Sequence, residues 1–250
     1  MRQAPLGFRE KYQFFLQPMP ILVLAAVLVV VALIFVVSAP EKEVPLTLEE
    51  LLVTKMSLAA EKNTYSLVVE ESGPGYSLRF TGQVAEGNVY GNIAAYDLEI
   101  FSDQNKYFVR GEDLFEEWEE MGEAELGALS AVVHEPLELL ETLLVAEDVV
   151  VEEGPRRMVD NVECQTYFVE VPPPELHLLT RFDNEDAQLN KLRLYLWYNE
   201  EDEFLYRMAV LLSVTVDDET VEINRIYNMH PDAPAIPQDV PNPDKDYLPI

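Results

Sequence analysis

The residues able to do chemistry are few and lie apart from one another. The three histidines, His134, His177 and His230, occur in no His-x-x-x-His or Glu-x-x-His pattern that would turn two metal ligands to one helix face. Gly-x-Ser-x-Gly, a phosphate-binding glycine loop and a dinucleotide fingerprint are all absent from the sequence. With 46 acidic residues, some carboxylate pairs will be close by chance alone. We therefore expect no enzyme, no metal site and no cofactor.

The densest acidic segment, 112–120, surrounds Leu114, Phe115 and Trp118 with acids and fits either a strand or a helix. Calcium coordination is a conceivable role, but no Asp-x-Asp-x-Asp-Gly loop is present to fix the oxygens. A solvated acidic face is the favoured interpretation. The single cysteine, Cys164, allows no intrachain disulfide and falls in a strand-like run, where we expect a small buried hydrophobe.

Charge excludes one class of partner. The formal net charge is −29, and the first twenty residues carry Arg2, Arg9 and Lys11 against only Glu10, so the negative charge lies beyond them. Such a surface repels phosphate backbones, and no nucleic-acid partner is expected. The hydrophobic fraction of 48% is high enough to argue against disorder for most of the chain.

An apolar run at 21–37 contains no charged or hydrogen-bonding side chain. Extended to 19–39, it approaches the ~20 residues that a helix needs to cross the hydrocarbon core. Val37-Ser38-Ala39 resembles a signal cleavage site, but Pro40 would follow the cut, so an uncleaved anchor is favoured. The basic residues precede the run, which places the N-terminus in the cytoplasm and the rest outside it. We expect a cytoplasmic segment 1–18, an anchor 19–39, an extracytoplasmic domain 40–230 and an extended tail 231–250.

The domain opens with a helix and continues with strands. Thr47-Leu48-Glu49-Glu50 is a capping box, which predicts an amphipathic helix over 46–62. Alternation of apolar and polar residues then predicts strands at 65–71, 76–84, 89–93, 96–100 and 106–110, with turns at 72–75 and 102–105.

The second half repeats this change of period. Leucines between 126 and 144 predict two short helices, with Pro136 at the first position of the second. Strands are predicted at 149–153, 162–171, 192–198, 204–216 and 221–227, and the strand 204–216 has one unbroken apolar face. The predicted fold class is α+β: a curved antiparallel sheet, or incomplete β-barrel, with helices on its concave side, preceded by one transmembrane helix.

In this order of elements, the segment 46–228 resembles the LolA and LppX/LprG-like superfamily of lipoprotein- and lipid-binding envelope domains. The resemblance is carried by TYSLVVEESGPGYSLRFTGQV after the opening helix, YDLEIFSDQNKYFVRG, LGALSAVVHEPLELLETLL, VDNVECQTYFVEV and WYNEEDEFLYRMAV. It implies a half-barrel whose concave side is plugged by helices and accepts acyl chains. This chain has no cysteine after its apolar run for lipidation, so a tethered, local role is expected rather than a shuttling carrier.

Two hypotheses follow. In the first, the domain binds a lipid or a lipoprotein acyl chain, and Leu140, Leu143 and Leu144 gate an apolar cavity. The residues expected to line that cavity are Leu78, Phe80, Leu98, Ile100, Trp197, Tyr206, Met208 and Leu212. In the second, the same fold is a regulatory or scaffold domain that binds an envelope protein, because a fold does not fix a function.

Overall fold

The computed structural model describes residues 46–241 except 104–105, 112–114, 123–125, 127–128, 130–131, 173–187, 217, 234–236 and 238, and leaves the side chains of 115 and 116 undescribed. These residues belong to one compact unit, Leu46–Ile250. The predicted anchor, 19–39, lies outside the described residues. Among the residues that are described, no helix is both long and apolar enough to span a membrane.

The helices are α2 (Leu48–Glu61) and α4 (Pro136–Leu144), with a short 3-10 turn η2 (Ala94–Tyr96). The strands of the first half are β1 (Thr64–Gly73), β2 (Tyr76–Ala85), β3 (Asn88–Ile93), β4 (Leu98–Asp103), β5 (Lys106–Gly111) and β6 (Phe115–Met121). Those of the second half are β7 (Val150–Glu153), β8 (Arg157–Val159), β9 (Val162–Val171), β10 (Gln188–Asn199), β11 (Phe204–Val216) and β12 (Glu219–His230).

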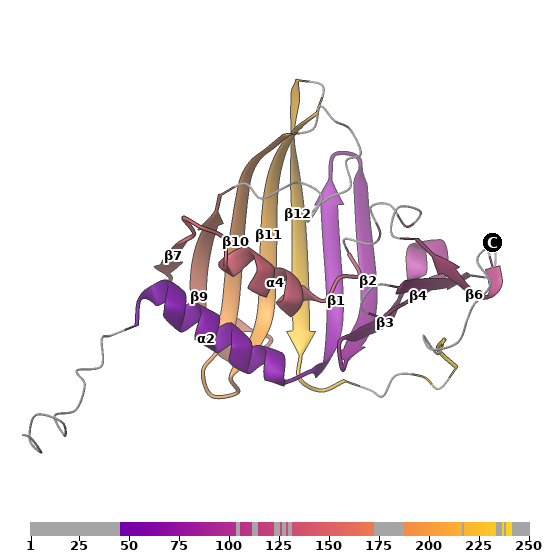
Figure 1. The fold of residues 1–250 in the computed structure, drawn as a ribbon, viewed down its shortest axis with the longest axis horizontal. Helices are drawn as coiled ribbons and strands as arrows, with labels where there is room; N and C mark the ends of the chain where they lie inside the picture. Colours follow the sequence, from indigo (N-terminus) through magenta and orange to yellow (C-terminus); the bar gives the residue numbers. More distant parts are fainter. Residues whose placement is uncertain are drawn as a thin grey trace, which may run out of the picture. The chain divides into compact units, whose positions relative to one another are not determined.

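Within the described part of the chain, these strands form one 12-stranded antiparallel sheet in the order β6-β5-β4-β3-β2-β1-β12-β11-β10-β9-β7, with β8 paired to β9. No pairing joins β6 to β7 there, so the sheet is open. The strand direction turns progressively from β9 to β6, as the right-handed twist of strands requires (Figure 1). The predicted α+β class with an antiparallel sheet is thus confirmed.

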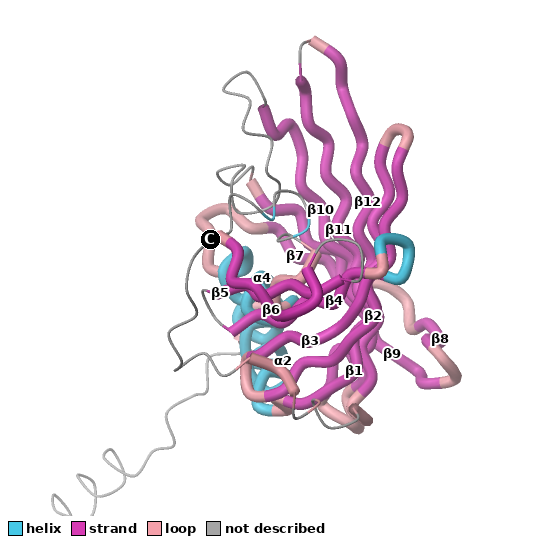
Figure 2. Tube along the Cα trace, turned by 90° about the vertical axis from the view of Figure 1, so that its right-hand side faces the viewer, coloured by secondary structure: helices cyan, strands magenta, loops and turns pink. Residues whose placement is uncertain are grey.

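Both helices lie on the same face of the sheet (Figures 1 and 2), which we call the covered face. In β1, buried residues alternate with less buried ones, because successive side chains point to opposite faces of the sheet. The buried residues Tyr65, Leu67 and Val69 lie on the covered face. Their cross-strand partners Met229 and Tyr227 are fully buried as well. The other face is called the outer face.

Two glycines make room for the ring of Phe80 in the β2–β3 pair. Gly82 and Gly91 are directly opposite one another. A Cβ on Gly91 would lie within 2.5 Å of the Thr81 carbonyl oxygen and would clash with the ring of Phe80, which is fully buried. The absence of side chains at both positions therefore lets the Phe80 ring lie across the strands.

The structure corrects several predicted boundaries. Tyr96 was expected on a strand, but Asp97 adopts a left-handed conformation (φ 49°), so β4 starts only at Leu98 and Tyr96 is 59% exposed. The undecided acidic segment ends as strand β6, and the short strand β8 was not predicted. Of the two predicted leucine-rich helices, the second is α4 with Pro136 in its first turn, and the first falls largely outside the described residues.

Candidate functional site

Two amphipathic helices form the layer over the covered face. Thr47 and Glu50 make the predicted capping box, in which the Glu50 amide donates to the Thr47 hydroxyl at 3.2 Å and Oε2 of Glu50 accepts from the Thr47 amide at 2.8 Å. In α4, the Glu135 side chain caps the helix by accepting from the Glu138 amide at 2.5 Å. The helices contact each other, and α2 also contacts β7 and β11.

A cavity of about 310 Å³ lies where the two helices meet. Its walls are mostly aliphatic, and only serine and glutamate contribute polar groups. The lining residues are Val53, Met56, Ser57, Ala60 and Glu61 of α2 with Leu137, Glu141 and Leu144 of α4. The spacing of three and four residues along each helix explains why these side chains share one line.

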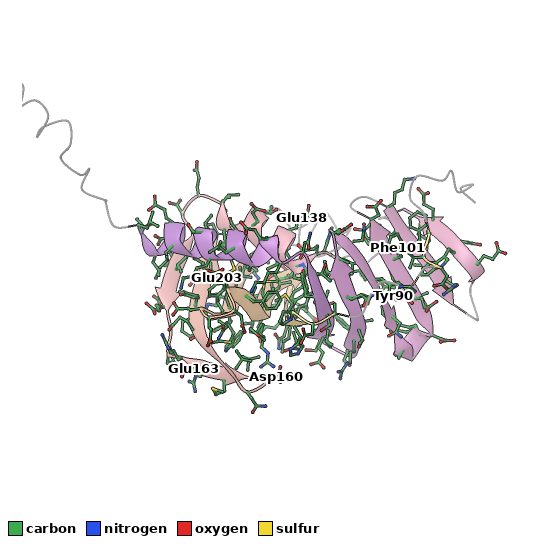
Figure 3. All side chains as sticks on the ribbon, turned by 90° about the horizontal axis from the view of Figure 1, so that it is seen from below. Tyr90, Phe101, Glu138, Asp160, Glu163 and Glu203 are labelled. Atoms are coloured by element: carbon green, nitrogen blue, oxygen red, sulfur yellow. The ribbon has the colours of Figure 1, made fainter. Side chains whose placement is uncertain are left out.

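A second cavity of about 390 Å³ adjoins the first and shares Ala60, Leu137 and Glu141 with it. Its remaining lining residues are Asn63, Tyr65, Val84, Gly87, Glu135 and Glu138. The two cavities adjoin at the three residues that they share, and we call them together the helix groove. Figure 3 shows Glu138 in the helical layer, on the side opposite Asp160 and Glu163 of the β8–β9 hairpin.

A partly buried acid, Glu135, lies at the end of this groove. The Glu135 carboxylate accepts a hydrogen bond from the Tyr65 hydroxyl. Burial raises the pKa of Glu135 above its ordinary 4.5, although the bonds from Tyr65 and the Glu138 amide act in the opposite direction. Burial, together with the charge of Glu135, also raises the pKa of Tyr65. Tyr65 is therefore a neutral hydrogen-bond donor here.

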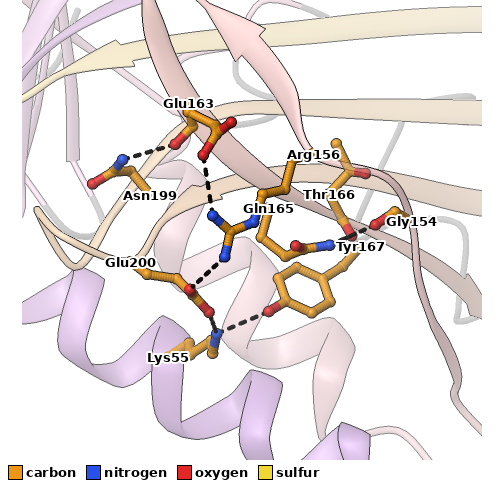
Figure 4. A network of polar contacts seen from close by, with 9 residues as sticks. All are labelled: Lys55, Gly154, Arg156, Glu163, Gln165, Thr166, Tyr167, Asn199 and Glu200. Carbon is orange, nitrogen blue, oxygen red and sulfur yellow. Dashed lines mark hydrogen bonds and ion pairs between the residues drawn. The ribbon is translucent and has the colours of Figure 1, made fainter.

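One lysine holds α2 to the sheet. Nζ of Lys55 donates to the Tyr167 hydroxyl at 2.9 Å and to Oε1 of Glu200 at 2.7 Å (Figure 4). It also lies 5.2 Å from the ring centroid of Tyr198. Burial opposes its charge, but these partners raise the pKa of Lys55 overall. Arg156 extends the network by bonding both Glu200 and Glu163. This network fixes the position of the wall that α2 gives to the groove.

An ion pair is buried on the covered face, where β1 and β12 pair. Arg225 and Glu71 are directly opposite, both Nε and Nη2 of Arg225 lie 2.5 Å from Oε2 of Glu71, and the residues are 2% and 5% exposed. The Tyr76 hydroxyl donates to Glu71 at 2.9 Å, and Arg225 donates to the Tyr227 hydroxyl at 3.3 Å. The charges are thus neutralised within the protein.

Most of the predicted lining residues come together, but as packed core. Phe80, Ile100, Leu140, Leu143, Met208 and Leu212 are at most 2% exposed and belong to one hydrophobic cluster with Leu98 and Leu144. Leu78 is partly buried against the same cluster. Of the predicted residues, Leu144 lines the helix groove. The leucines of α4 therefore pack the helix against the sheet and do not gate an empty cavity in it.

Two predicted residues are placed differently. Trp197 lies on the outer face: it is directly opposite Arg207, whose guanidinium is 5.9 Å from its ring, and it stacks on Tyr195. Tyr206 is an extra residue at the bulge between the Trp197–Arg207 and Tyr198–Leu205 pairs. Its hydroxyl donates to Asp202 at 2.6 Å, and its ring packs on Phe204 and His230. Alternation alone could not place a side chain at a bulge.

The cysteine behaves as the sequence indicated. Cys164 is fully buried, and burial raises the pKa of its thiol to about 11. A thiol of this kind holds its proton at neutral pH. Over the described ranges, no group of three or more His, Cys, Asp or Glu residues is arranged to hold a metal ion.

Apart from Leu144, the sequence analysis missed the residues that line the helix groove. Val53, Met56 and Ala60 recur every three or four residues on α2, and Leu137, Glu141 and Leu144 do so on α4. This stripe was readable in the sequence. Its function was not, because a stripe that packs on a sheet and a stripe that faces a groove have the same period.

The fold defines a class: an open antiparallel sheet with helices on one face. No family profile and no curated protein sequence matches the chain. Among solved structures, the lipoprotein LppX of Mycobacterium tuberculosis is similar, with 12% identity and a TM-score of 0.44, over 72% of this chain and 93% of that one. LprF of Mycobacterium bovis is similar at 12% identity and a TM-score of 0.40, over 76% and 96%.

The MucA/MucB complex of Pseudomonas aeruginosa is also similar, at 11% identity and a TM-score of 0.32, over 73% of this chain and 58% of that one. At these identities the likeness concerns the fold.

Proposed function

We propose that this chain is a membrane-anchored, extracytoplasmic domain that binds the hydrocarbon chain of a lipid or lipoprotein in its helix groove, without catalysing a reaction. The observation that carries the proposal is the apolar stretch of the groove between α2 and α4. Val53, Met56, Leu137 and Leu144 line a cavity there with the part of each side chain that does not pack in the hydrophobic core. Ligand pockets usually begin at about 300 Å³ and are mostly apolar with few polar groups. The first cavity meets that description, whereas the second is large enough but has a more polar lining.

The proposal moves the site away from where the sequence placed it. The sheet residues expected to form the cavity wall belong to the hydrophobic cluster or pack against it, and none of them lines either cavity. The resemblance to the LolA and LppX/LprG-like superfamily favours the same class of ligand. The extracytoplasmic location rests on the basic residues Arg2, Arg9 and Lys11 before the apolar run.

Photo-crosslinking tests the proposal directly. The full chain, held in nanodiscs of zwitterionic lipid, is irradiated with a hexadecanol probe that carries a mid-chain diazirine, and the labelled peptides are mapped by mass spectrometry. Labelling is expected within 53–61 and 137–144. Ala60→Trp, which fills the point shared by both cavities, should remove it, whereas Leu51→Trp on the exposed side of the same helix should not. Labelling spread evenly over the domain, or unchanged by Ala60→Trp, would reject the proposal.

One observation favours the second candidate function, binding of an envelope protein. Phe168, Tyr195 and Trp197 form an aromatic row on the outer face, with ring centroids 5.2 Å and 6.5 Å apart. Val150 and Leu211 on the same face are 54% and 39% exposed. Aromatic residues of this kind are enriched in protein interfaces. A photoreactive amino acid at Tyr195 should then crosslink one defined membrane protein, and crosslinking to none would remove this candidate.

A further inference from the structure

The rim of the helix groove carries charge of one sign only. All the acidic or basic residues that line its two cavities are glutamates: Glu61, Glu135, Glu138 and Glu141. No lysine, arginine or histidine lines either cavity. An apolar floor bordered by carboxylates is therefore the chemical pattern that a bound molecule has to match.

The four glutamates are not equivalent. Glu135 is engaged by the Tyr65 hydroxyl and by the Glu138 amide, so its carboxylate already has donors within the protein. Glu138 and Glu141 are exposed and lie three residues apart, which puts both carboxylates on one side of α4. Glu61 is exposed at the end of α2, across the first cavity from Glu141. Carboxylates of this kind can meet a ligand without losing a bond to the protein.

Charge decides what head group a bound chain can have. A phosphate, sulfonate or carboxylate head at this rim would stand beside several like charges, which is unfavourable. The net charge of −29 adds a long-range field of the same sign. An ammonium head would instead be attracted by the field and would pair with the rim while its chain lay on the apolar floor.

We propose that the helix groove takes a cationic amphiphile, whose aliphatic chain lies against Val53, Met56 and Leu137 and whose ammonium head meets Glu138 and Glu141. This inference rests on the proposed function, because it names the chemical class of the ligand for the same groove. It commits to a small amphiphile because each cavity, at about 310 and 390 Å³, is of small-molecule size.

Competition between two head groups on the same chain tests it. The full chain in zwitterionic nanodiscs is labelled with the uncharged hexadecanol probe in the presence of dodecylamine or sodium dodecanesulfonate. The measured quantity is the ratio of the two concentrations that halve the labelling. We expect the amine to be favoured, and this preference to fall about fivefold or more in Glu138→Gln/Glu141→Gln, the effect of losing roughly one close charge contact in water.

Comparing the ratio between proteins cancels the different partitioning of the two competitors into the bilayer. Glu49→Gln/Glu147→Gln removes the same charge from exposed positions outside the groove and should keep the wild-type ratio. An equal ratio in the wild type and the rim variant would overturn the cationic-head inference while leaving chain binding intact. Failure of the probe to label 53–61 or 137–144 at all would reject the proposed function itself.

Discussion

At the scale of single residues, a few ionisable side chains are buried, where desolvation makes their charged form unfavourable. Arg225 is buried, and burial disfavours its charge, yet the nearby Tyr227 and Glu71 raise its pKa. A buried pair of this kind adds little by itself, because desolvation offsets the attraction. Breaking it is different, because one uncompensated charge then remains inside the protein.

We therefore expect Glu71→Leu to lower the free energy of unfolding by about 3–5 kcal/mol. The double variant Glu71→Leu/Arg225→Leu should recover most of that loss, since neither charge is left behind. Urea unfolding of both variants measures the two values. A double variant as unstable as the single one would show that the cost comes from lost packing around Tyr76 and Tyr227 instead.

The second residue-scale prediction concerns Glu135 and pH. Its pKa is raised by burial, so the folded protein holds a proton there that the unfolded chain releases near pH 4.5. The contribution of Glu135 to stability is then largest at low pH and declines as the pH rises above 4.5 toward the raised pKa, by at most about 1.4 kcal/mol per pH unit.

Glu135→Gln cannot titrate, so its unfolding free energy should decline less with rising pH than that of the wild type. Urea unfolding at several pH values between 4.5 and 7.5 checks this, with Glu147→Gln as the control for the loss of one acid at an exposed position. Parallel curves for the wild type and Glu135→Gln would mean that the carboxyl of Glu135 is not desolvated in solution.

At the scale of elements, α2 depends on one cation. Lys55 is 13% exposed and touches β9 and the β10–β11 turn through Tyr167 and Glu200. These are charge-assisted bonds, and the ring of Tyr198 adds a cation–π contribution. The partner carboxylate is half exposed, which limits what the ion pair alone can contribute.

Lys55→Met should accordingly cost about 1–3 kcal/mol and should loosen α2 in particular. Hydrogen exchange is the informative measurement: amides within 48–61 should exchange faster, while those of β11 keep their protection. Lys62→Met, at the C-terminal end of the same helix, is the matched control. If exchange rises equally across the sheet, Lys55 stabilises the whole domain and is no specific tether for α2.

At the scale of the whole molecule, the proposed arrangement is a cytoplasmic N-terminus, an anchor within 19–39 and an extracytoplasmic sheet. The anchor lies outside the described residues, so its orientation is a proposal from the flanking charges. This orientation can be tested by cysteine labelling. Cys164 is the single cysteine of the chain and is buried, so its replacement leaves an introduced cysteine as the only thiol.

In a Cys164→Ala background, Met158→Cys should react with a membrane-impermeant maleimide in intact cells, since Met158 is 62% exposed. Gln3→Cys should react only after the membrane is opened. Labelling of both cysteines before lysis, or of neither, would contradict the orientation derived from Arg2, Arg9 and Lys11.

The sequence by itself determined the elements whose signals are local. The Thr47–Glu50 capping box, the Pro136 helix start and the strand-like run 162–171 depend on neighbouring residues, and each was predicted. The antiparallel α+β class followed from their order. Errors appeared where one residue changes the local geometry, such as Asp97 before β4 and the bulge at Tyr206.

Only the tertiary structure decided how distant segments meet. Glu71 and Arg225 are 154 positions apart, and no local pattern pairs them. The helix groove exists because α2 and α4 lie on the same face of the sheet and contact each other. Whether a leucine of one helix packs or lines a cavity depends on which part of its side chain the other helix covers. Period determines the face on which a side chain lies, but contacts between remote segments determine what it meets there.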